Sequence, residues 1–371
     1  MSLPAQEKTA PARPTGKVRL AIVGTGGVAN AHLRAHSRNP DLVEIVALSD
    51  VVPGKAAEFA ARHGLVGVRC VGHYGEVLAL PEVEAVDVCT RPEGHASASL
   101  AALAVGKHVL CEKPLATSVA EARSMLDAAN ASGCVNMVDF TYRYFPGARF
   151  IRSLIDAGEI GEILRVRAEY LRDAVTPPPE GWPTLRRRPD PADPSANIVG
   201  DLGSHMIDLA RFFGGEIERV SGQYRVFGDY DESAIVTVDF TSGAVGSLEA
   251  TSVATGRGGN FRRVEVHGTK GAATFWFSRP SQIELYTTTG ATYYSRGFVT
   301  VPVPGIPYTE VDYEAWVQGL TNASRIFAEA IRRGEKAKAD FGDGYIATLI
   351  MEAAFQSSRT GQTIDLRSFA S

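Results

Sequence analysis

The hydrophobic positions in the first third of the chain form short continuous runs that alternate with segments of helical period. Apolar runs separated by helices are typical of βαβ units, whose parallel strands are covered on both faces. Ser118 followed by Glu121 predicts the start of one such helix, and Gly133 its end. The expected strands are residues 18–23, 43–48, 85–89, 108–111 and 135–140. We therefore predict a parallel sheet of the α/β class.

After residue 142 the pattern changes, and strand-like runs follow one another across short glycine turns. The expected strands are residues 163–171, 217–227, 234–240, 245–252, 262–267 and 272–277. The turns at 241–243 and 268–271 suit hairpins, so this half is predicted to be a mainly antiparallel α+β sheet. Two late helices are expected at 313–333 and 345–359, separated by turn signals at 342–344, and a third near Asp201.

A chain of 371 residues exceeds the size at which one hydrophobic core usually keeps growing, so two domains are expected. We predict a flexible tail over residues 1–16, a first domain over 17–141 and a second over 142–371, with the last helix able to pack back on the first domain. Residues 174–200 contain seven prolines together with Trp182. A connection this long is either a flap near the active site or a solvated excursion.

Composition narrows the possible classes of protein. The hydrophobic fraction of 44% and charged fraction of 22% are those of a globular protein, and no apolar run reaches the roughly 18 residues of a membrane helix. A net charge of -4 argues against nucleic-acid partners. The four cysteines lie far apart without a C-x-x-C pair, which predicts buried thiols in a reducing cytoplasm and no disulfide or metal site.

A glycine-rich turn directly follows the first expected strand. Residues 24–29 read Gly24-Thr25-Gly26-Gly27-Val28-Ala29 and open a helix, the context in which G-x-G-x-x-A binds a dinucleotide pyrophosphate. Asp50, 26 residues after Gly24, ends the second strand where a carboxylate accepts hydrogen bonds from the adenosine ribose. A carboxylate there repels a 2'-phosphate, so NAD is predicted rather than NADP. The alternatives are a glycine turn without ligand and an aspartate that only caps a turn.

Lys113, Asp201 and His205 are the candidates for chemistry. Hydride removal from an alcohol carbon requires a base for the hydroxyl proton and a cation near the developing alkoxide. Lys113 follows the carboxyl end of a parallel strand, the edge where open α/β sheets bind ligands. Asp201 and His205 are four residues apart, which places them on one face of an α-helix. The alternatives are that Lys113 is an exposed lysine at a strand end, that Asp201 is a helix N-cap and that His205 is a structural histidine.

These segments together resemble the Gfo/Idh/MocA oxidoreductases, named for glucose-fructose oxidoreductase and inositol dehydrogenase. The resemblance covers the chain from Lys17 to its end. The motifs that carry it are the glycine turn, Val86-Asp87-Val88-Cys89-Thr90 with His95, Glu112-Lys113-Pro114, Tyr142-Arg143 with Pro146, and the Asp201 and His205 pair. The chain departs from the family after Thr90. The family commonly has Pro-Asn there, whereas this chain has Arg91-Pro92-Glu93-Gly94 before His95, which affects the contacts of this loop on the nicotinamide side.

The resemblance implies an N-terminal Rossmann domain and a C-terminal open sheet that packs against another subunit in a homodimer or homotetramer. A cleft between the domains would hold nicotinamide and substrate. Carried over by position, Lys113 orients the substrate hydroxyl from a cis Lys113-Pro114 bond, His205 is the general base, and Asp201 binds substrate or orients His205. The implied cofactor contacts are Gly24, Thr25, Gly26, Gly27, Val28, Ala29, Asp50, Thr90, Glu112 and Lys113.

We therefore predict an NAD-dependent dehydrogenase that oxidises a secondary alcohol of a sugar, inositol or anhydrosugar. The reverse reduction is equally compatible with these residues. Two alternatives are a redox-neutral glycoside hydrolase or lyase that uses bound NAD transiently, and an NAD-binding sensor without turnover. Candidates for substrate contact are His95, Arg143, Tyr170, Asp173 and Trp182, because polyols are held by convergent polar groups and an aromatic face.

Overall fold

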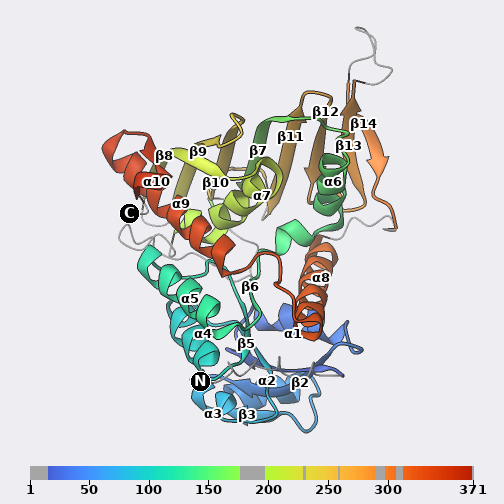
Figure 1. The fold of residues 1–371 in the computed structure, drawn as a ribbon, viewed down its shortest axis with the longest axis vertical. Helices are drawn as coiled ribbons and strands as arrows, with labels where there is room; N and C mark the ends of the chain where they lie inside the picture. The colour runs from blue at the N-terminus through green and yellow to red at the C-terminus, as the bar shows by residue number, and fades with distance from the viewer. Residues whose placement is uncertain are drawn as a thin grey trace, which may run out of the picture.

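The computed structural model describes residues 16–175, 197–228, 231–257, 260–288, 297–305 and 312–369, and these residues build two sheets (Figure 1). The first sheet has six parallel strands in the order β3-β2-β1-β4-β5-β6. Its strands are β1 Val18–Val23, β2 Val43–Ser49, β3 Arg69–Val71, β4 Ala85–Val88, β5 His108–Cys111 and β6 Asn136–Val138. Its helices are α1 Ala29–Ser37, α2 Lys55–Arg62, α3 Tyr74–Leu78, α4 His95–Ala104 and α5 Val119–Ser132. The predicted parallel sheet is confirmed.

The strand order reverses between β1 and β4, so the connections that leave the carboxyl ends of these two strands run to opposite sides of the sheet. In open α/β sheets this reversal is where ligands bind. The helix predicted after Ser118 is α5: the Ser118 hydroxyl accepts the backbone N–H of Glu121, and Gly133 ends the helix in the left-handed region with φ 66°. The strand β3 was not predicted, because it has only three residues at the edge of the sheet and little apolar signal.

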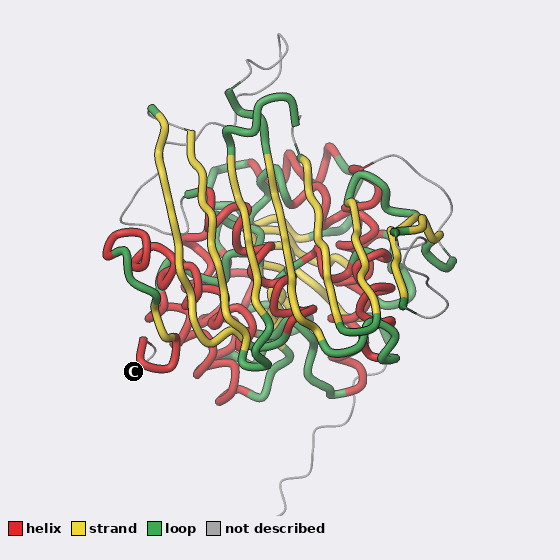
Figure 2. The backbone as a smooth tube through the Cα atoms, turned by 90° about the horizontal axis from the view of Figure 1, so that it is seen from above, coloured by secondary structure: helices red, strands yellow, loops and turns green. Residues whose placement is uncertain are grey.

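The second sheet has nine strands in the order β14-β13-β12-β11-β7-β10-β9-β8-β15. All neighbouring pairs are antiparallel except β7 with β10. The strands are β7 Ile163–Leu171, β8 Ile217–Phe227, β9 Asp231–Phe240, β10 Val245–Thr251, β11 Phe261–Gly268, β12 Gly271–Trp276, β13 Gln282–Thr287, β14 Val299–Pro302 and β15 Ile364–Asp365. Figure 2 shows the helices behind this sheet, with none of the described helices in front of it.

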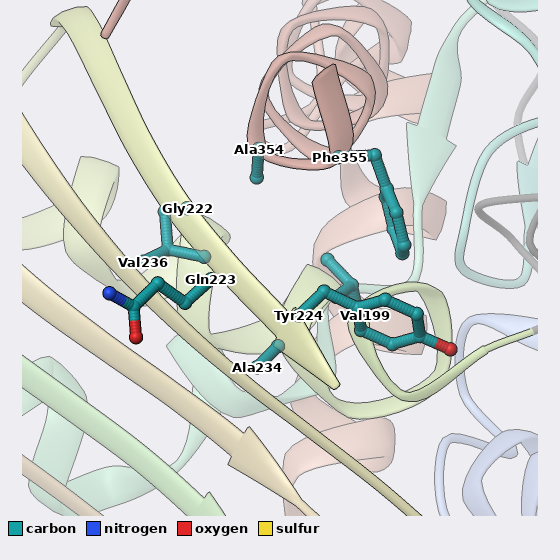
Figure 3. Close-up of a pocket in the computed structure, with 8 residues that line it drawn as sticks. All are labelled: Val199, Gly222, Gln223, Tyr224, Ala234, Val236, Ala354 and Phe355. Atoms are coloured by element: carbon teal, nitrogen blue, oxygen red, sulfur yellow. The ribbon is translucent and has the colours of Figure 1, made fainter. Parts of the chain in front are cut away.

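The helices of the second half connect the two sheets. They are α6 Pro146–Asp156, α7 Ser204–Gly214, α8 Asp312–Arg333, α9 Phe341–Thr360 and α10 Leu366–Phe369. Helix α8 packs on α1 through Leu320, Ala31 and Ala35. Helix α9 contacts both α5 and β8, and a side chain at Gly222 of β8 would collide with the backbone of Ala354 (Figure 3). The domain boundary at 141/142 stays a prediction.

Two details of the expected helices were wrong. Residues 342–344 do not separate the last two helices but form the first turn of α9, whose N-cap is Asp340. The Asp340 carboxylate accepts the N–H groups of Gly342 and Asp343, which offsets the low helix propensity of the glycines. The helix expected near Asp201 begins as a π-helical turn, Val199–Gly203, before α7 starts at Ser204.

Among the described residues, no helix combines the length and the apolar character that crossing a membrane requires.

Candidate active site

The glycine turn between β1 and α1 is packed on one side and open on the other. Gly24 has φ 92°, and a Cβ there would lie 2.9 Å from the backbone of Cys89 and Thr90, so only glycine fits. At Gly26 and Gly27 a Cβ would meet nothing within 4 Å. No side chain caps α1 at Val28, so the positive end of the helix dipole is open to an anion, although the N–H groups of Asn30 and Ala31 already donate to backbone carbonyls. The turn therefore fits a dinucleotide pyrophosphate.

Asp50 is fixed beside this turn. Its carboxylate accepts hydrogen bonds from the Thr25 N–H at 2.9 Å, the Thr25 hydroxyl at 2.8 Å and the Val52 N–H at 3.0 Å, and pairs with the Lys55 ammonium at 3.0 Å. Burial raises the pKa of Asp50, but the Val52, Thr25 and Lys55 contacts outweigh it and lower that pKa to about 2. The carboxylate is thus ionised at neutral pH, as a ribose-binding acid must be.

Replacing Asp50 by Ser should weaken NADH and strengthen NADPH, because the negative charge is removed and the Lys55 ammonium loses its partner. Loss of hydrogen bonds to a charged group amounts to about 1.5–3 kcal/mol, or roughly 10-fold to 150-fold in the NADH to NADPH affinity ratio. Fluorescence titration of both reduced cofactors measures that ratio. The matched control, Asp50→Ser with Lys55→Ala, should lose the gain for NADPH. An unchanged ratio in Asp50→Ser would exclude the ribose role.

Lys113 follows β5 and reaches the second half of the chain. The Lys113–Pro114 peptide is cis, as predicted. The Lys113 ammonium donates to the carbonyl oxygen of Asp201 at 2.7 Å and to its Oδ1 at 3.0 Å. Burial lowers the pKa of Lys113, but the charges of Asp201 and Glu112 outweigh it and raise the pKa. The structure therefore holds a protonated ammonium, 17% exposed, where the two halves meet.

His205 lies in the first turn of α7 and is only 7% exposed. Its ring stacks on that of Tyr142, with centroids 4.2 Å apart and planes 28° from parallel. Burial, reinforced by the positive charge of Lys113, lowers the pKa of His205 well below its usual value. Its Nδ1 has no hydrogen-bond partner within the described part of the chain. The imidazole is therefore neutral at pH 7 and able to accept a proton.

Asp201 differs from its prediction. The π-helical turn that contains it widens the helix, so Asp201 and His205 do not share a regular α-helical face. The Asp201 side chain is 52% exposed and pairs with Lys113 and, at 3.6 Å, with Arg172. The partial loss of solvent around Asp201 raises its pKa, but the charges of Lys113 and Arg172 outweigh this effect and lower the pKa. Its hydrogen bonds therefore orient the lysine, and no described contact orients His205 through this carboxylate.

Aromatic and guanidinium groups surround the His205 ring. Arg262 donates to the Tyr142 hydroxyl at 2.8 Å and lies over its ring, 5.0 Å from the centroid. Tyr170, a predicted contact, is buried beside them and donates its hydroxyl to Asn260 at 2.7 Å. Tyr142, Arg172 and Arg262 are site residues that the sequence analysis missed. The Tyr142-Arg143 motif was a signal for Tyr142, which precedes the predicted contact Arg143 in the sequence.

Two of the predicted substrate contacts, Arg143 and His95, are buried and held by partners inside the protein. Arg143 is buried and pairs with Asp208 and Asp343, which uses its guanidinium inside the protein. His95 lies within hydrogen-bonding distance of the carbonyl oxygens of Pro114 and Thr90. The structure therefore argues against both as substrate contacts.

Asp173 accepts the N–H of Gly256 at 2.8 Å and so joins the end of β7 to the loop after β10. Trp182 and most of the proline-rich segment lie outside the described residues.

Thr90 and Glu112 have hydrogen-bond partners within the protein, and their cofactor contacts stay a prediction. The Thr90 hydroxyl donates to the carbonyl of Arg91, where Pro92–Gly94 forms a short 3-10 helix. Glu112 directs one carboxylate oxygen to the N–H of Lys113 and the other to the ring of His32. The Glu112 carboxylate therefore points into the protein, where it supports Lys113.

A dinucleotide turn beside a protonated lysine and a neutral histidine is equipped to move a hydride between an alcohol and a nicotinamide. The fold and the site define the chain as an NAD-dependent oxidoreductase. A hollow between β8 and α9, lined by apolar groups such as Phe355, contains none of these catalytic candidates and has no room for a ligand (Figure 3).

Comparison with known proteins agrees with this class. Residues 18–140 match the family model described as the oxidoreductase family with NAD-binding Rossmann fold, and residues 148–274 match the GFO/IDH/MocA C-terminal domain. The chain is 29% identical over 391 residues to levoglucosan dehydrogenase of Pseudarthrobacter phenanthrenivorans, which covers 94% of this chain and 98% of that protein. It is 28% identical to inositol 2-dehydrogenase of Rhizobium meliloti, over 92% of this chain and 96% of that protein.

The fold agrees as well. The structure of levoglucosan dehydrogenase in complex with NADH and levoglucosan superposes with a TM-score of 0.84 at 28% identity, covering 94% of this chain and 99% of that one. The chain belongs to the Gfo/Idh/MocA oxidoreductase family. The predictions of the family, of the fold class and of NAD as the cofactor are confirmed.

Proposed function

We propose that the enzyme oxidises a secondary hydroxyl of a sugar, an inositol or an anhydrosugar to the ketone, reversibly. One observation carries this proposal. Lys113, which follows a strand of the first sheet, donates hydrogen bonds to Asp201, which lies four residues before His205 in the second half of the chain. The names of two relatives, levoglucosan dehydrogenase and inositol 2-dehydrogenase, support polyol substrates.

The protein's own residues divide the work of the reaction. When bound at the glycine turn, NAD supplies the hydride acceptor. The neutral imidazole of His205 takes the hydroxyl proton, and the Lys113 ammonium stabilises the negative charge that develops on the same oxygen. Asp201 holds the ammonium and has an exposed carboxylate that can accept hydrogen bonds from neighbouring hydroxyls of a polyol.

A screen of sugars, cyclitols and anhydrosugars for NADH absorbance tests the proposal. The expected result is stoichiometric NADH formation from at least one cyclic polyol and none from its deoxy analogue at the oxidised carbon. Bond cleavage of a glycoside without net NADH would instead indicate the redox-neutral hydrolase or lyase. Tight NAD binding without turnover of any member of the screen would indicate a sensor.

We infer that the uncovered face of the nine-stranded sheet packs against another copy of the chain in a dimer or tetramer. Ile235 and Val245 are exposed on β9 and β10 at 48% and 50%. Exposed apolar side chains on a broad uncovered sheet support an interface. Light scattering of the purified protein tests this inference, and a monomer at micromolar concentration would contradict it.

We also propose that the protein works in the cytoplasm. All four cysteines are free, and Cys89 and Cys111 are buried, which suits a reducing compartment. Cell fractionation that placed the protein outside the cytoplasm would contradict this assignment.

A further inference from the structure

A cluster of titratable side chains lies beneath the active site. It contains His32 and His36 from α1, Asp87 from β4, Glu112 after β5 and Asp139 after β6, all buried. The sequence signals for it are polar residues on the inner side of α1 and an aspartate within an apolar central strand. Buried charges persist only when they are paired and hydrogen-bonded. We call these five residues the carboxylate cluster.

His32 is the centre of the carboxylate cluster. Its Nδ1 lies 2.8 Å from Asp87 Oδ2, and its Nε2 lies 2.9 Å from Glu112 Oε1 and 3.2 Å from Asp139 Oδ2. A neutral imidazole has one N–H, so its other nitrogen would present a lone pair to a carboxylate oxygen. An imidazolium donates on both sides. Burial lowers the pKa of His32, but Asp87 and the other partners outweigh it and raise the pKa well above the usual value.

Glu112 connects the carboxylate cluster to the catalytic lysine. One of its oxygens faces His32, and the other accepts the backbone N–H of Lys113 at 2.9 Å. The Lys113 side chain then continues to Asp201, across the meeting of the two halves. A continuous chain of polar contacts thus runs from His32 to the group that stabilises the alkoxide.

We propose that His32 is a positioning residue for the hydride transfer: as an imidazolium it keeps Glu112 an ionised acceptor and so fixes the backbone from which Lys113 reaches the substrate. This inference rests on the proposed function, because the rate of NAD-dependent oxidation is one of its readouts. His36 serves as a built-in comparison. It shares Asp87 Oδ2 with His32, at 2.7 Å, but its other nitrogen meets Ser324 and it has no described contact with Glu112.

The charged and titratable groups around Glu112 define what a pH measurement will report. Those that interact with it or with its partners are His32, Lys113, His95, Asp139, Asp87, Cys89 and Cys111. Burial raises the pKa of Glu112, but His32 and then Lys113 outweigh it and lower the pKa. Because the ionised form holds Lys113, activity is lost as the pH falls through this pKa. Removing the His32 cation leaves burial opposed mainly by Lys113, which raises the pKa of Glu112 and moves that loss to higher pH.

The first test compares His32→Gln with His36→Gln. His32→Gln is expected to lower kcat by about 10²-fold, the scale of a small misplacement of a catalytic group. Its acid limb in the pH profile should move up by at least about one pH unit, the effect of losing a nearby opposite charge, and its NADH dissociation constant should stay unchanged. His36→Gln should lower thermal stability while leaving the kcat profile in place. An equal loss of kcat at every pH in both variants would overturn the proposal.

A second pair of variants extends the test, and Glu112→Gln alone keeps it valid if His32→Gln does not fold. Glu112→Gln removes one buried charge and retains an acceptor, but its amide cannot accept from both His32 and Lys113. Glu112→Gln should therefore lower kcat at neutral pH. The double variant His32→Gln/Glu112→Gln should have nearly the same kcat as Glu112→Gln, and its pH profile should contain no acid limb that Glu112→Gln lacks. Multiplicative losses in the double variant would mean that the two residues act separately.

Two measurements are independent of turnover. NMR spectra of protein labelled with ¹⁵N-histidine report the protonation of each ring nitrogen. The signals of His32, identified by their absence from the spectrum of His32→Gln, should show two protonated ring nitrogens at pH 8. A single protonated nitrogen would overturn the imidazolium. The side-chain oxygens and nitrogens of His32, Glu112 and Asp139 lie within 4.8 Å of one another, so a stoichiometric metal in the purified protein would overturn it as well. Failure of wild-type oxidation would refute the proposed function but not these two results.

Discussion

His205→Asn is expected to lower kcat by about 10²-fold to 10⁴-fold, the effect of removing a general base. The wild-type imidazole is buried beside Lys113, which keeps its pKa below the usual value and its base form present at neutral pH. Protonation of His205 should therefore contribute an acid limb below pH 6.5 to the wild-type profile, and the residual activity of the variant should retain only the acid limb that Glu112 contributes. Steady-state rates from pH 5 to 9 on a substrate from the screen measure both.

His108→Asn is the matched control for this variant. His108 is a partly buried histidine on β5 that accepts the N–H of Val135 and does not contact the site. Its substitution should leave the pH profile unchanged, and NADH binding should persist in both variants. Wild-type turnover by His205→Asn at neutral pH would mean that another group takes the hydroxyl proton.

Lys113→Ala is expected to reduce kcat by about 10²-fold to 10³-fold, as when one donor to a developing oxyanion is removed. The ammonium is held by Asp201 and kept protonated by the charges of Asp201 and Glu112, so its loss removes the cation nearest the reacting oxygen. Added methylammonium should restore part of the rate in a concentration-dependent way, because it supplies the missing cation. The same amine should have no effect on His205→Asn.

The conservative variant Lys113→Arg separates charge from position. A guanidinium keeps the charge but is planar and larger than the ammonium that fits between the carbonyl and carboxylate of Asp201. It should retain NADH binding and only part of the rate. Full activity of Lys113→Ala without added amine would contradict the assigned role.

Much of the fold followed from local pattern. The strands β1, β5, β7 and β8 begin and end at the predicted residues, because each is an apolar or alternating run between clear turns. Helix α6 was not predicted, although Pro146 occupies its first turn. The strands β3, β13, β14 and β15 were not predicted. Of these, β3, β14 and β15 are short edge strands that bury little apolar surface.

The site was predictable where a motif fixes the backbone, and less so where partners come from distant segments. Gly24, Asp50, Lys113 and His205 stand where the motifs indicated. Arg143 was misjudged because its partners Asp208 and Asp343 are far away in the sequence. The π-helical turn at Asp201 and the carboxylate cluster around His32 depend on tertiary packing, which no spacing rule reveals.

A crystal structure with NADH and a polyol from the screen would test the central claim most directly. It should show the dinucleotide pyrophosphate at Gly26 and Gly27, and one carbinol oxygen within hydrogen-bonding distance of both the Lys113 ammonium and the His205 ring. A polyol bound away from these two groups, or NADH bound elsewhere than at the glycine turn, would contradict the account.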